Sequence, residues 1–202
     1  MKKTILLCTL TALMTSLVYG QDLTGFMGIP FGTNKAQLKT IIKAKFPAST
    51  IETDDEKTLS FDNTSFGGRK AVLLLFGLNS NQDYHTAVVL LEPEFESGVF
   101  SLYDDVVSEV TSKYGEPGDV LENYLYPYDK SDKYSHGVTA LKTGKLDMAS
   151  LWTFPANDVG SGDDNVIQVK ITPRAFVKIS YQDGKLINAV VEAKEQKAKQ
   201  DY

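Results

Sequence analysis

The chain has 202 residues with a formal net charge of −5, and 42% of its residues are hydrophobic. That length and apolar share are enough for one larger domain, or two small ones, to fold around a core of its own. Nucleic acid and anionic membrane surfaces are disfavoured as partners, because they attract concentrated positive charge and no stretch of this acidic chain forms a basic patch.

The N-terminus has the pattern of a secretory signal peptide, with cleavage before Gln21. Two lysines precede the uncharged apolar stretch 5–18, which is shorter than the roughly 20 residues of a membrane-spanning helix. Cys8 is the only cysteine and falls inside residues 1–20, so the mature chain has no thiol for a disulfide, a metal site or nucleophilic catalysis. We therefore expect a secreted or periplasmic protein of a bacterial cell envelope, without a membrane span.

Residues 21–95 are predicted to form a first module that begins with a helix. Asn34 has the side chain of an N-cap, and Gln37, three residues later, completes a capping box. Pro47 ends the helix. The residues that share one apolar face of this helix are Leu38, Ile41, Ile42 and Phe46.

Four strands are predicted after this helix, over residues 50–53, 58–62, 71–76 and 84–91. Gly67 and Gly68, between the second and third strands, suit the positive φ angles of a hairpin turn. The stretches 72–76 and 87–91 are continuously apolar, which predicts central strands that are covered.

Residues 96–192 repeat the pattern of a helix followed by strands. Gly115 is predicted to be the C-cap of this helix, and Pro117 blocks its continuation. The helix has an apolar stripe made of Val99, Tyr103, Val106, Val107, Val110 and Tyr114. The predicted strands are 148–154, 166–172, 175–181 and 186–192, with Asp183 and Gly184 as the hairpin turn between the last two. The charged tail, 193–202, has no apolar stripe and is predicted to be a frayed helix or disordered.

These elements predict the α+β class. Strands joined by short turns pair antiparallel, because parallel pairing needs long crossovers. Helices segregated to one side of an antiparallel sheet complete the class. Two arrangements fit the pattern: two helix-plus-antiparallel-sheet modules in tandem, or one continuous antiparallel sheet with both helices on one face.

Two short motifs resemble a module of small bacterial envelope proteins. The first is GTNKAQL at residues 32–38, where a capping residue is followed by Gln and an aliphatic residue; the second is YGEP at residues 114–117, a Gly-x-Pro helix stop. The pattern resembles outer-membrane assembly lipoproteins of the SmpA/OmlA type and secreted β-lactamase inhibitor proteins, and the latter repeat the module in tandem. The resemblance implies a non-catalytic protein that works by surface contact. The mature chain lacks the lipid-acceptor cysteine of the lipoproteins and the disulfides of the inhibitors.

No constellation of catalytic residues emerges from the sequence, so we expect no enzyme activity, no cofactor and no metal. His85 and His136 are the only imidazoles and lie far apart in the chain, which disfavours general base catalysis and a zinc site. Glu92, Glu94 and Glu96 alternate around Pro93, but they fit a solvent-facing strand exit better than the carboxylate pair of a glycosidase.

The loop 158–165 is the one place where calcium deserves consideration. Asp158, Asp163, Asp164 and Asn165 offer the oxygen ligands that hard cations prefer. Their spacing differs from that of an EF-hand, and a solvated acidic hairpin loop is the plainer interpretation. Calcium binding by this loop stays an open question at this point.

A tyrosine-rich strip supplies the candidate binding residues. Tyr124, Tyr126 and Tyr128 alternate, so in a strand they would share one face, and Pro127 would confine that strand to a sheet edge. Tyrosine suits binding surfaces because it buries a large rigid ring while its hydroxyl stays hydrogen-bonded. The candidate set is Tyr124, Tyr126, Tyr128, Tyr134, His136 and Trp152. Ordinary packing of an edge strand or of the core is the alternative interpretation.

The sequence therefore predicts a non-enzymatic envelope protein that binds another macromolecule, foremost a protein of the cell envelope, through the face or edge of its sheet. An inhibitor of an extracellular enzyme is the sharper form of this hypothesis. A small-ligand or glycan binder that uses the tyrosine strip is the alternative from another class.

Overall fold

The computed structural model describes residues 22–156 and 162–200, which fold into helices and antiparallel strands and confirm the α+β class. The first half contains β1 (Gly25–Phe26), β2 (Ile29–Pro30), α1 (Lys35–Lys45), β3 (Thr50–Asp54), β4 (Thr58–Asp62), β5 (Thr64–Phe66), β6 (Arg69–Leu78) and β7 (Tyr84–Leu91). The second half contains the 3-10 turn η1 (Glu96–Gly98), α2 (Val99–Tyr114), β8 (Asp119–Tyr124), η2 (Lys130–Asp132), α3 (Gly137–Lys142), β9 (Leu146–Phe154), β10 (Asn165–Ile171), β11 (Val177–Gln182) and α4 (Gly184–Gln200).

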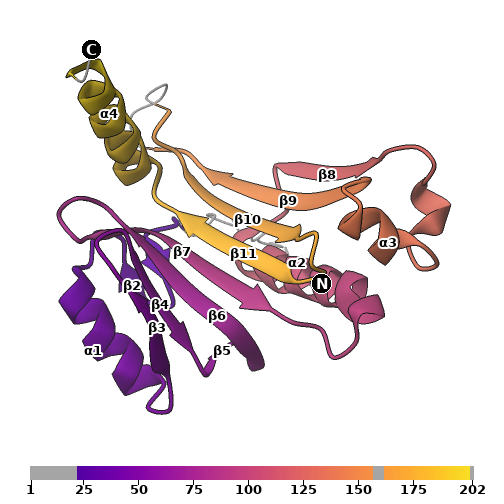
Figure 1. Cartoon of the computed structure of the whole chain (residues 1–202), viewed down its shortest axis with the longest axis horizontal. Helices are drawn as coiled ribbons and strands as arrows, with labels where there is room; N and C mark the ends of the chain where they lie inside the picture. The colour runs from indigo at the N-terminus through magenta and orange to yellow at the C-terminus, as the bar shows by residue number, and fades with distance from the viewer. Residues whose placement is uncertain (1–21, 157–161, 201–202) are drawn as a thin grey trace, which may run out of the picture.

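One large sheet runs through both halves of the chain (Figure 1). Its strand order is β3-β4-β6-β7-β11-β10-β9-β8, with β5 paired to β6, and every pair is antiparallel. The last strand of each half, β7 and β11, lie side by side, so the two halves share a continuous sheet. In each half a helix, α1 or α2, precedes the strands of the large sheet, but β1 and β2 come before α1, α3 lies between β8 and β9, and α4 follows β11. The Gly67–Gly68 turn, with φ angles of 57° and 74°, joins β5 to β6.

Both α1 and α2 pack on the same face of this sheet. Cross-strand neighbours on that face form a continuous row, Leu59, Phe76, Ala87, Tyr181, Ile167 and Trp152. Leu38 and Ile42 of α1 and Val106 and Val110 of α2 are buried in the same hydrophobic cluster. We call this side the covered face. Because side chains alternate along a strand, the residues between these point to the opposite side.

The first helix begins largely as predicted. Asn34 Oδ1 accepts a hydrogen bond from the Ala36 backbone N–H at 2.9 Å, which satisfies one of the free donors at the helix start. The Gln37 side chain makes no hydrogen bond with any residue in the described ranges, so the predicted capping box is only half formed. The helix ends at Lys45, just before Pro47.

The predicted last strand, residues 186–192, is wrong, because this segment lies in α4. Asp183 is the N-cap of that helix, since its Oδ1 accepts from the Leu186 backbone N–H at 2.8 Å. A hairpin turn and a helix start both favour aspartate, which explains the misreading. Gly184 is required by close packing, since a Cβ atom there would overlap the backbone of residues 163 and 164. The helix continues through Gln200, where we predicted a frayed or disordered tail.

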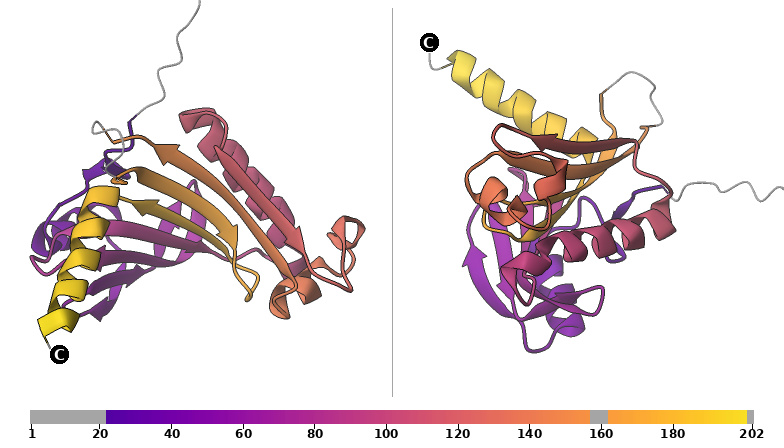
Figure 2. Two further views of the ribbon diagram at one scale, coloured as in Figure 1. Left: turned by 90° about the horizontal axis from the view of Figure 1, so that it is seen from above. Right: turned by 90° about the vertical axis from the view of Figure 1, so that its right-hand side faces the viewer.

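The C-terminal helix lies on the other side of the sheet from α2 (Figure 2). Its first turns contact β7 and β10, and Asp183 N–H donates to His85 O at 2.9 Å. Beyond Val190 the side chains described for α4 are exposed. Among the helices of the described ranges, none has both the length and the hydropathy that crossing a bilayer requires.

Candidate binding site

The candidate tyrosines lie near one edge of the sheet but do not form one row. Strand β8 ends at Tyr124, and Tyr126 and Pro127 occupy a turn. Tyr126 is 91% exposed, whereas Tyr124 and Tyr128 are half-buried against the hydrophobic core. The alternation in sequence therefore does not become a shared face, because the strand stops before its second tyrosine.

The other members of the candidate set are scattered. Tyr134 is 74% exposed and packs edge-to-face on Phe100, with ring centroids 6.2 Å apart. His136 is exposed in the N-cap position of α3. Trp152 is buried, and its Nε1–H donates to Gly115 O at 2.8 Å, which ties β9 to the end of α2. Trp152 is thus held by the core, away from the exposed tyrosines.

Tyr124 has an environment that keeps its phenol protonated. Burial first, and then the nearby Glu122 carboxylate, raise the pKa of Tyr124 to about 12. The Tyr124 hydroxyl donates to Glu122 Oε1 at 3.2 Å. Both side chains belong to β8 and lie on the covered side, because they neighbour the buried Leu146 and Met148 of β9.

The residues considered for catalysis lie apart from one another. Burial lowers the pKa of His85, whose Nδ1 is 2.8 Å from Thr86 Oγ1. Glu92, Glu94 and Glu96 are exposed after β7, and Glu96 forms an ion pair with Lys142 at 2.7 Å. In the part of the chain that the structure describes, no three His, Cys, Asp or Glu side chains converge where a metal ion could be held.

The loop considered for calcium lies partly outside the described residues, Asp158 included. Of its described members, Asp164 Oδ1 accepts from Ala156 N–H at 3.0 Å, and Asp163 Oδ1 accepts from Asn188 Nδ2 at 2.9 Å. Asn165 bridges Leu23 O and Gly184 N–H, at 2.7 Å and 2.9 Å. The side chains of Asp163 and Asn165 therefore join the loop to α4 and the N-terminal segment.

A larger feature lies on the sheet surface opposite α1 and α2, beside the part under α4. Two neighbouring rows of side chains cross the strands β6-β7-β11-β10-β9-β8, and we call them together the open face. The first row is Leu73, Leu90, Lys178, Lys170, Ala149 and Leu121. The second row is Leu75, Val88, Ser180, Gln168, Leu151 and Asp119. Except for Ser180, all of these residues are partly or fully exposed.

The centre of the open face is polar and its flanks are aliphatic. Lys170 and Lys178 are directly opposite each other on β10 and β11, and neither forms an ion pair or a side-chain hydrogen bond within the described ranges. Beside them, Ser180 is only 2% exposed, and its Oγ has no hydrogen-bond partner in the part of the chain that the structure describes. Gln168 is opposite Ser180. These four residues form what we call the polar block.

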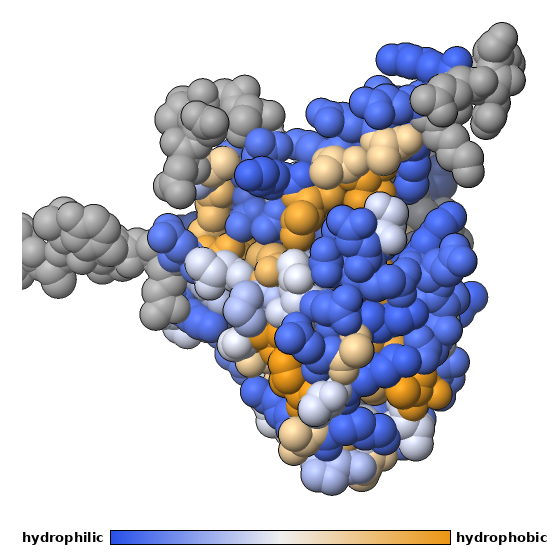
Figure 3. All heavy atoms as spheres, turned by 90° about the vertical axis from the view of Figure 1, so that its left-hand side faces the viewer, coloured by the Kyte–Doolittle hydropathy of each residue, from blue (hydrophilic) through white to orange (hydrophobic). Residues whose placement is uncertain are grey.

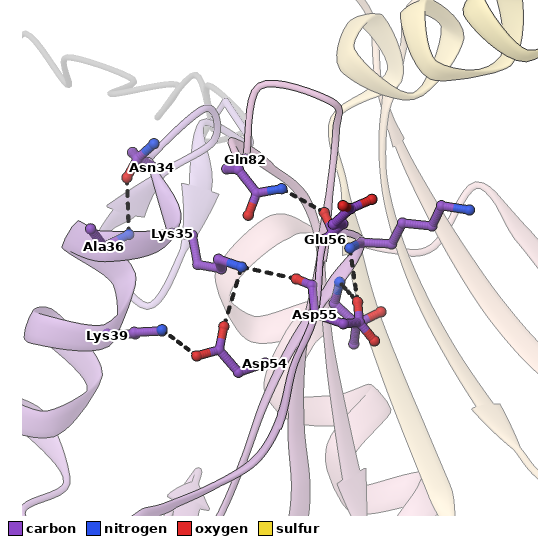
Figure 4. A network of polar contacts seen from close by, with 10 residues as sticks. Asn34, Lys35, Ala36, Lys39, Asp54, Asp55, Glu56 and Gln82 are labelled. Atoms are coloured by element: carbon purple, nitrogen blue, oxygen red, sulfur yellow. Dashed lines mark hydrogen bonds and ion pairs between the residues drawn. The ribbon is translucent and has the colours of Figure 1, made fainter.

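Some lysines elsewhere in the fold are paired, as the α1–β3 contact shows (Figure 4). Lys39 and Lys35 both bind the Asp54 carboxylate, and together they lower its pKa, with Lys39 contributing most. Lys35 also donates to Asp55 O at 2.9 Å. Among the described residues, the lysines of the polar block lack any such acceptor, which distinguishes them from this ion-paired edge.

Two hollows in the described surface lie elsewhere. A cavity of about 200 Å³ is lined by the β1–β2 segment together with Lys113 and Tyr114. A shallow hollow of about 480 Å³ lies over the exposed side of α1, around Ala36 and Ile41. Figure 3 views the molecule from the side of α1 and α4 and shows small hydrophobic areas separated by hydrophilic ones. Neither hollow includes a residue of the open face.

Sequence reasoning named a sheet face as a possible binding surface but did not identify the residues of the open face, although β10 and β11 carried a signal for them. In β11, Lys178, Ser180 and Gln182 alternate with Val177, Ile179 and Tyr181, which is the pattern of a half-covered strand. In β6 and β7 the sequence does not show which residues are covered and which are open, because leucine and valine occupy both faces there. No protein-family model, curated protein or solved structure matches this chain.

Proposed function

We propose that this chain is a secreted, non-catalytic protein of the bacterial envelope that binds another protein through its open face. The observation that carries the proposal is the pair of rows in which aliphatic side chains of β6, β7, β9 and β8 stay partly exposed on either side of the polar block. Contiguous exposed apolar surface with polar groups marks an interaction site. The signal-peptide pattern and the cysteine-free mature sequence support the envelope location.

A protein partner fits this surface better than a small ligand or a glycan. Small ligands bind in concave pockets that enclose most of their surface, and neither hollow described above reaches the open face. The two rows contain aliphatic and polar side chains but no aromatic ring on which a sugar could stack. Protein interfaces, by contrast, are broad and combine an apolar core with polar groups. The resemblance to envelope proteins that work by surface contact agrees with this role.

Site-specific photo-crosslinking tests the proposal in cells that produce the chain. A photoreactive phenylalanine analogue would replace Leu90 or Leu151, one on each flank of the open face. We expect a discrete adduct from both positions, whose second component mass spectrometry identifies as the same protein. The analogue placed at Ile41, on the exposed side of α1, provides the matched control.

The pattern of adducts decides the outcome. An adduct that forms at Leu90 and Leu151 but not at Ile41 supports binding through the open face. Adducts at Ile41 alone, or none at the two open-face positions, contradict it. Circular dichroism of each variant checks that the analogue leaves the sheet folded, because both replaced side chains are only partly buried.

A further inference from the structure

We infer that the polar block is an anchor for a carboxylate of the partner, held by Lys170 and Lys178 and flanked by apolar side chains of the same partner segment. This inference rests on the proposed function and specifies what the open face recognises. It begins from an electrostatic conflict: like charges directly opposite each other on neighbouring strands destabilise a sheet. No acidic side chain within the described ranges relieves this conflict.

The donors of the polar block match a carboxylate. Cβ atoms of directly opposed residues are about 5 Å apart, so two ammonium groups on flexible stems can converge on one anion. Gln168 offers amide hydrogens, and the Ser180 hydroxyl beneath the block is buried without a hydrogen-bond partner among the described residues. The chain as a whole carries a formal net charge of −5, so a general excess of positive charge does not account for this pair.

The flanks of the block define a spacing for the partner. Leu90 and Val88 on β7 lie on one side, and Ala149 and Leu151 on β9 lie on the other. Strands are about 4.8 Å apart, so β7 and β9 are separated by about 14 Å across β11 and β10. An extended segment rises about 3.3 Å per residue, and residues four positions apart are therefore about 13 Å apart and point the same way. An extended segment that crosses the strands with the pattern apolar-x-acidic-x-apolar thus fits both flanks and the block.

Nuclear magnetic resonance titration with blocked five-residue peptides tests this recognition on the isotope-labelled full mature chain. The probe is Leu-Ser-Glu-Ser-Leu. Its controls are Leu-Ser-Gln-Ser-Leu, Leu-Ser-Lys-Ser-Leu and the rearranged Ser-Leu-Glu-Leu-Ser, in which the leucines no longer point with the acid. We expect saturable shifts of β10 and β11 amide signals and of the Leu90 and Leu151 methyl signals with the probe alone, weakened by added salt.

Lysine variants provide the second arm. The double replacement Lys170→Gln with Lys178→Gln is expected to lower the affinity for the probe peptide about tenfold or more, because charge-assisted hydrogen bonds are lost. Lys145→Gln, at an exposed position before β9, removes one positive charge elsewhere and is expected to change the affinity less than about twofold. Thermal unfolding of every variant shows whether it is folded, so that lost binding is not confused with lost folding. The single variant Lys178→Gln provides a milder replacement for the same comparison.

Three results would overturn the carboxylate anchor: equal shifts from the Glu and Gln peptides, no shifts from the probe, or unchanged affinity in a folded double variant. Binding to phosphatidylglycerol vesicles through the same lysines, without peptide binding, would assign the block to a lipid headgroup and also overturn it. None of these results changes the outcome expected for crosslinks at Leu90 and Leu151, so the proposed function can hold even if the carboxylate anchor is wrong. Absent crosslinks would overturn that function separately.

Discussion

The two faces of the sheet are built from alternate residues of the same strands, yet their chemistry differs. The covered face is rich in large rings, among them Phe61, Phe76 and Trp152, and these are buried. The open face has no ring in its two rows and places a lysine pair at its centre. Folding free energy comes mainly from buried apolar surface, so the covered face stabilises the fold. The open face contributes less and is free to carry binding residues.

Leucine-to-alanine replacement at two neighbouring positions of β6 should show the largest difference in stability between the two faces. Leu74 is buried on the covered face, and Leu75 is partly exposed on the open face. Leu74→Ala should lower the free energy of unfolding by about 2–5 kcal/mol, because it leaves a cavity in the core. Leu75→Ala should cost less than about 1 kcal/mol, because neighbouring water fills the space. Urea denaturation of both variants measures the difference, and equal costs would contradict the assignment of the faces.

Polar groups on the covered face should also matter to stability. The buried Tyr84 hydroxyl accepts from Phe26 N–H at 3.2 Å and donates to Ile29 O, so it holds both β1 and β2 to the sheet. Tyr84→Phe should cost about 1–3 kcal/mol in unfolding free energy, since the two backbone groups lose their partner. Tyr134→Phe, at an exposed ring, should stay within about 0.5 kcal/mol. A Tyr84→Phe variant as stable as wild type would mean that these bonds contribute nothing net.

Replacing a lysine of the pair should raise the unfolding free energy, whereas replacing a core residue lowers it. Lys178→Gln or Lys170→Gln removes the repulsion between opposed charges and should raise the unfolding free energy by about 0.2–1 kcal/mol. The double variant should gain little beyond either single one, because the first replacement already ends the repulsion. Denaturation at low and high salt checks the cause, since the gain should shrink as salt screens the charges. A loss of stability in either single variant would show that these side chains pack rather than repel.

Sequence periodicity could predict the α+β class, both amphipathic helices and most strands, because covered elements have strong apolar patterns. It could not choose between two modules and one sheet, since the pairing of β7 with β11 depends on contacts far apart in the chain. It also mistook residues 186–192 for a strand, where five apolar residues fit either period over a short window. The tyrosines attracted attention as a residue type, whereas the lysine pair becomes visible only when the register places Lys170 opposite Lys178.

The smallest predicted effect is a change of the unfolding free energy with pH, caused by the half-buried His85 of β7. Burial, with a further contribution from Lys194, lowers the pKa of His85, while the Leu78 backbone and Asp183 act in the opposite direction. The unfolded chain therefore binds a proton at pH values where the folded chain does not, so the unfolding free energy should fall as the pH drops below about 6.5. His85→Gln should flatten this part of the profile, whereas His136→Gln, at an exposed position, should leave the unfolding free energy within about 0.5 kcal/mol. Urea denaturation from pH 8 downwards measures both, and a wild-type profile that stays level through this range would show that burial does not keep His85 from protonation.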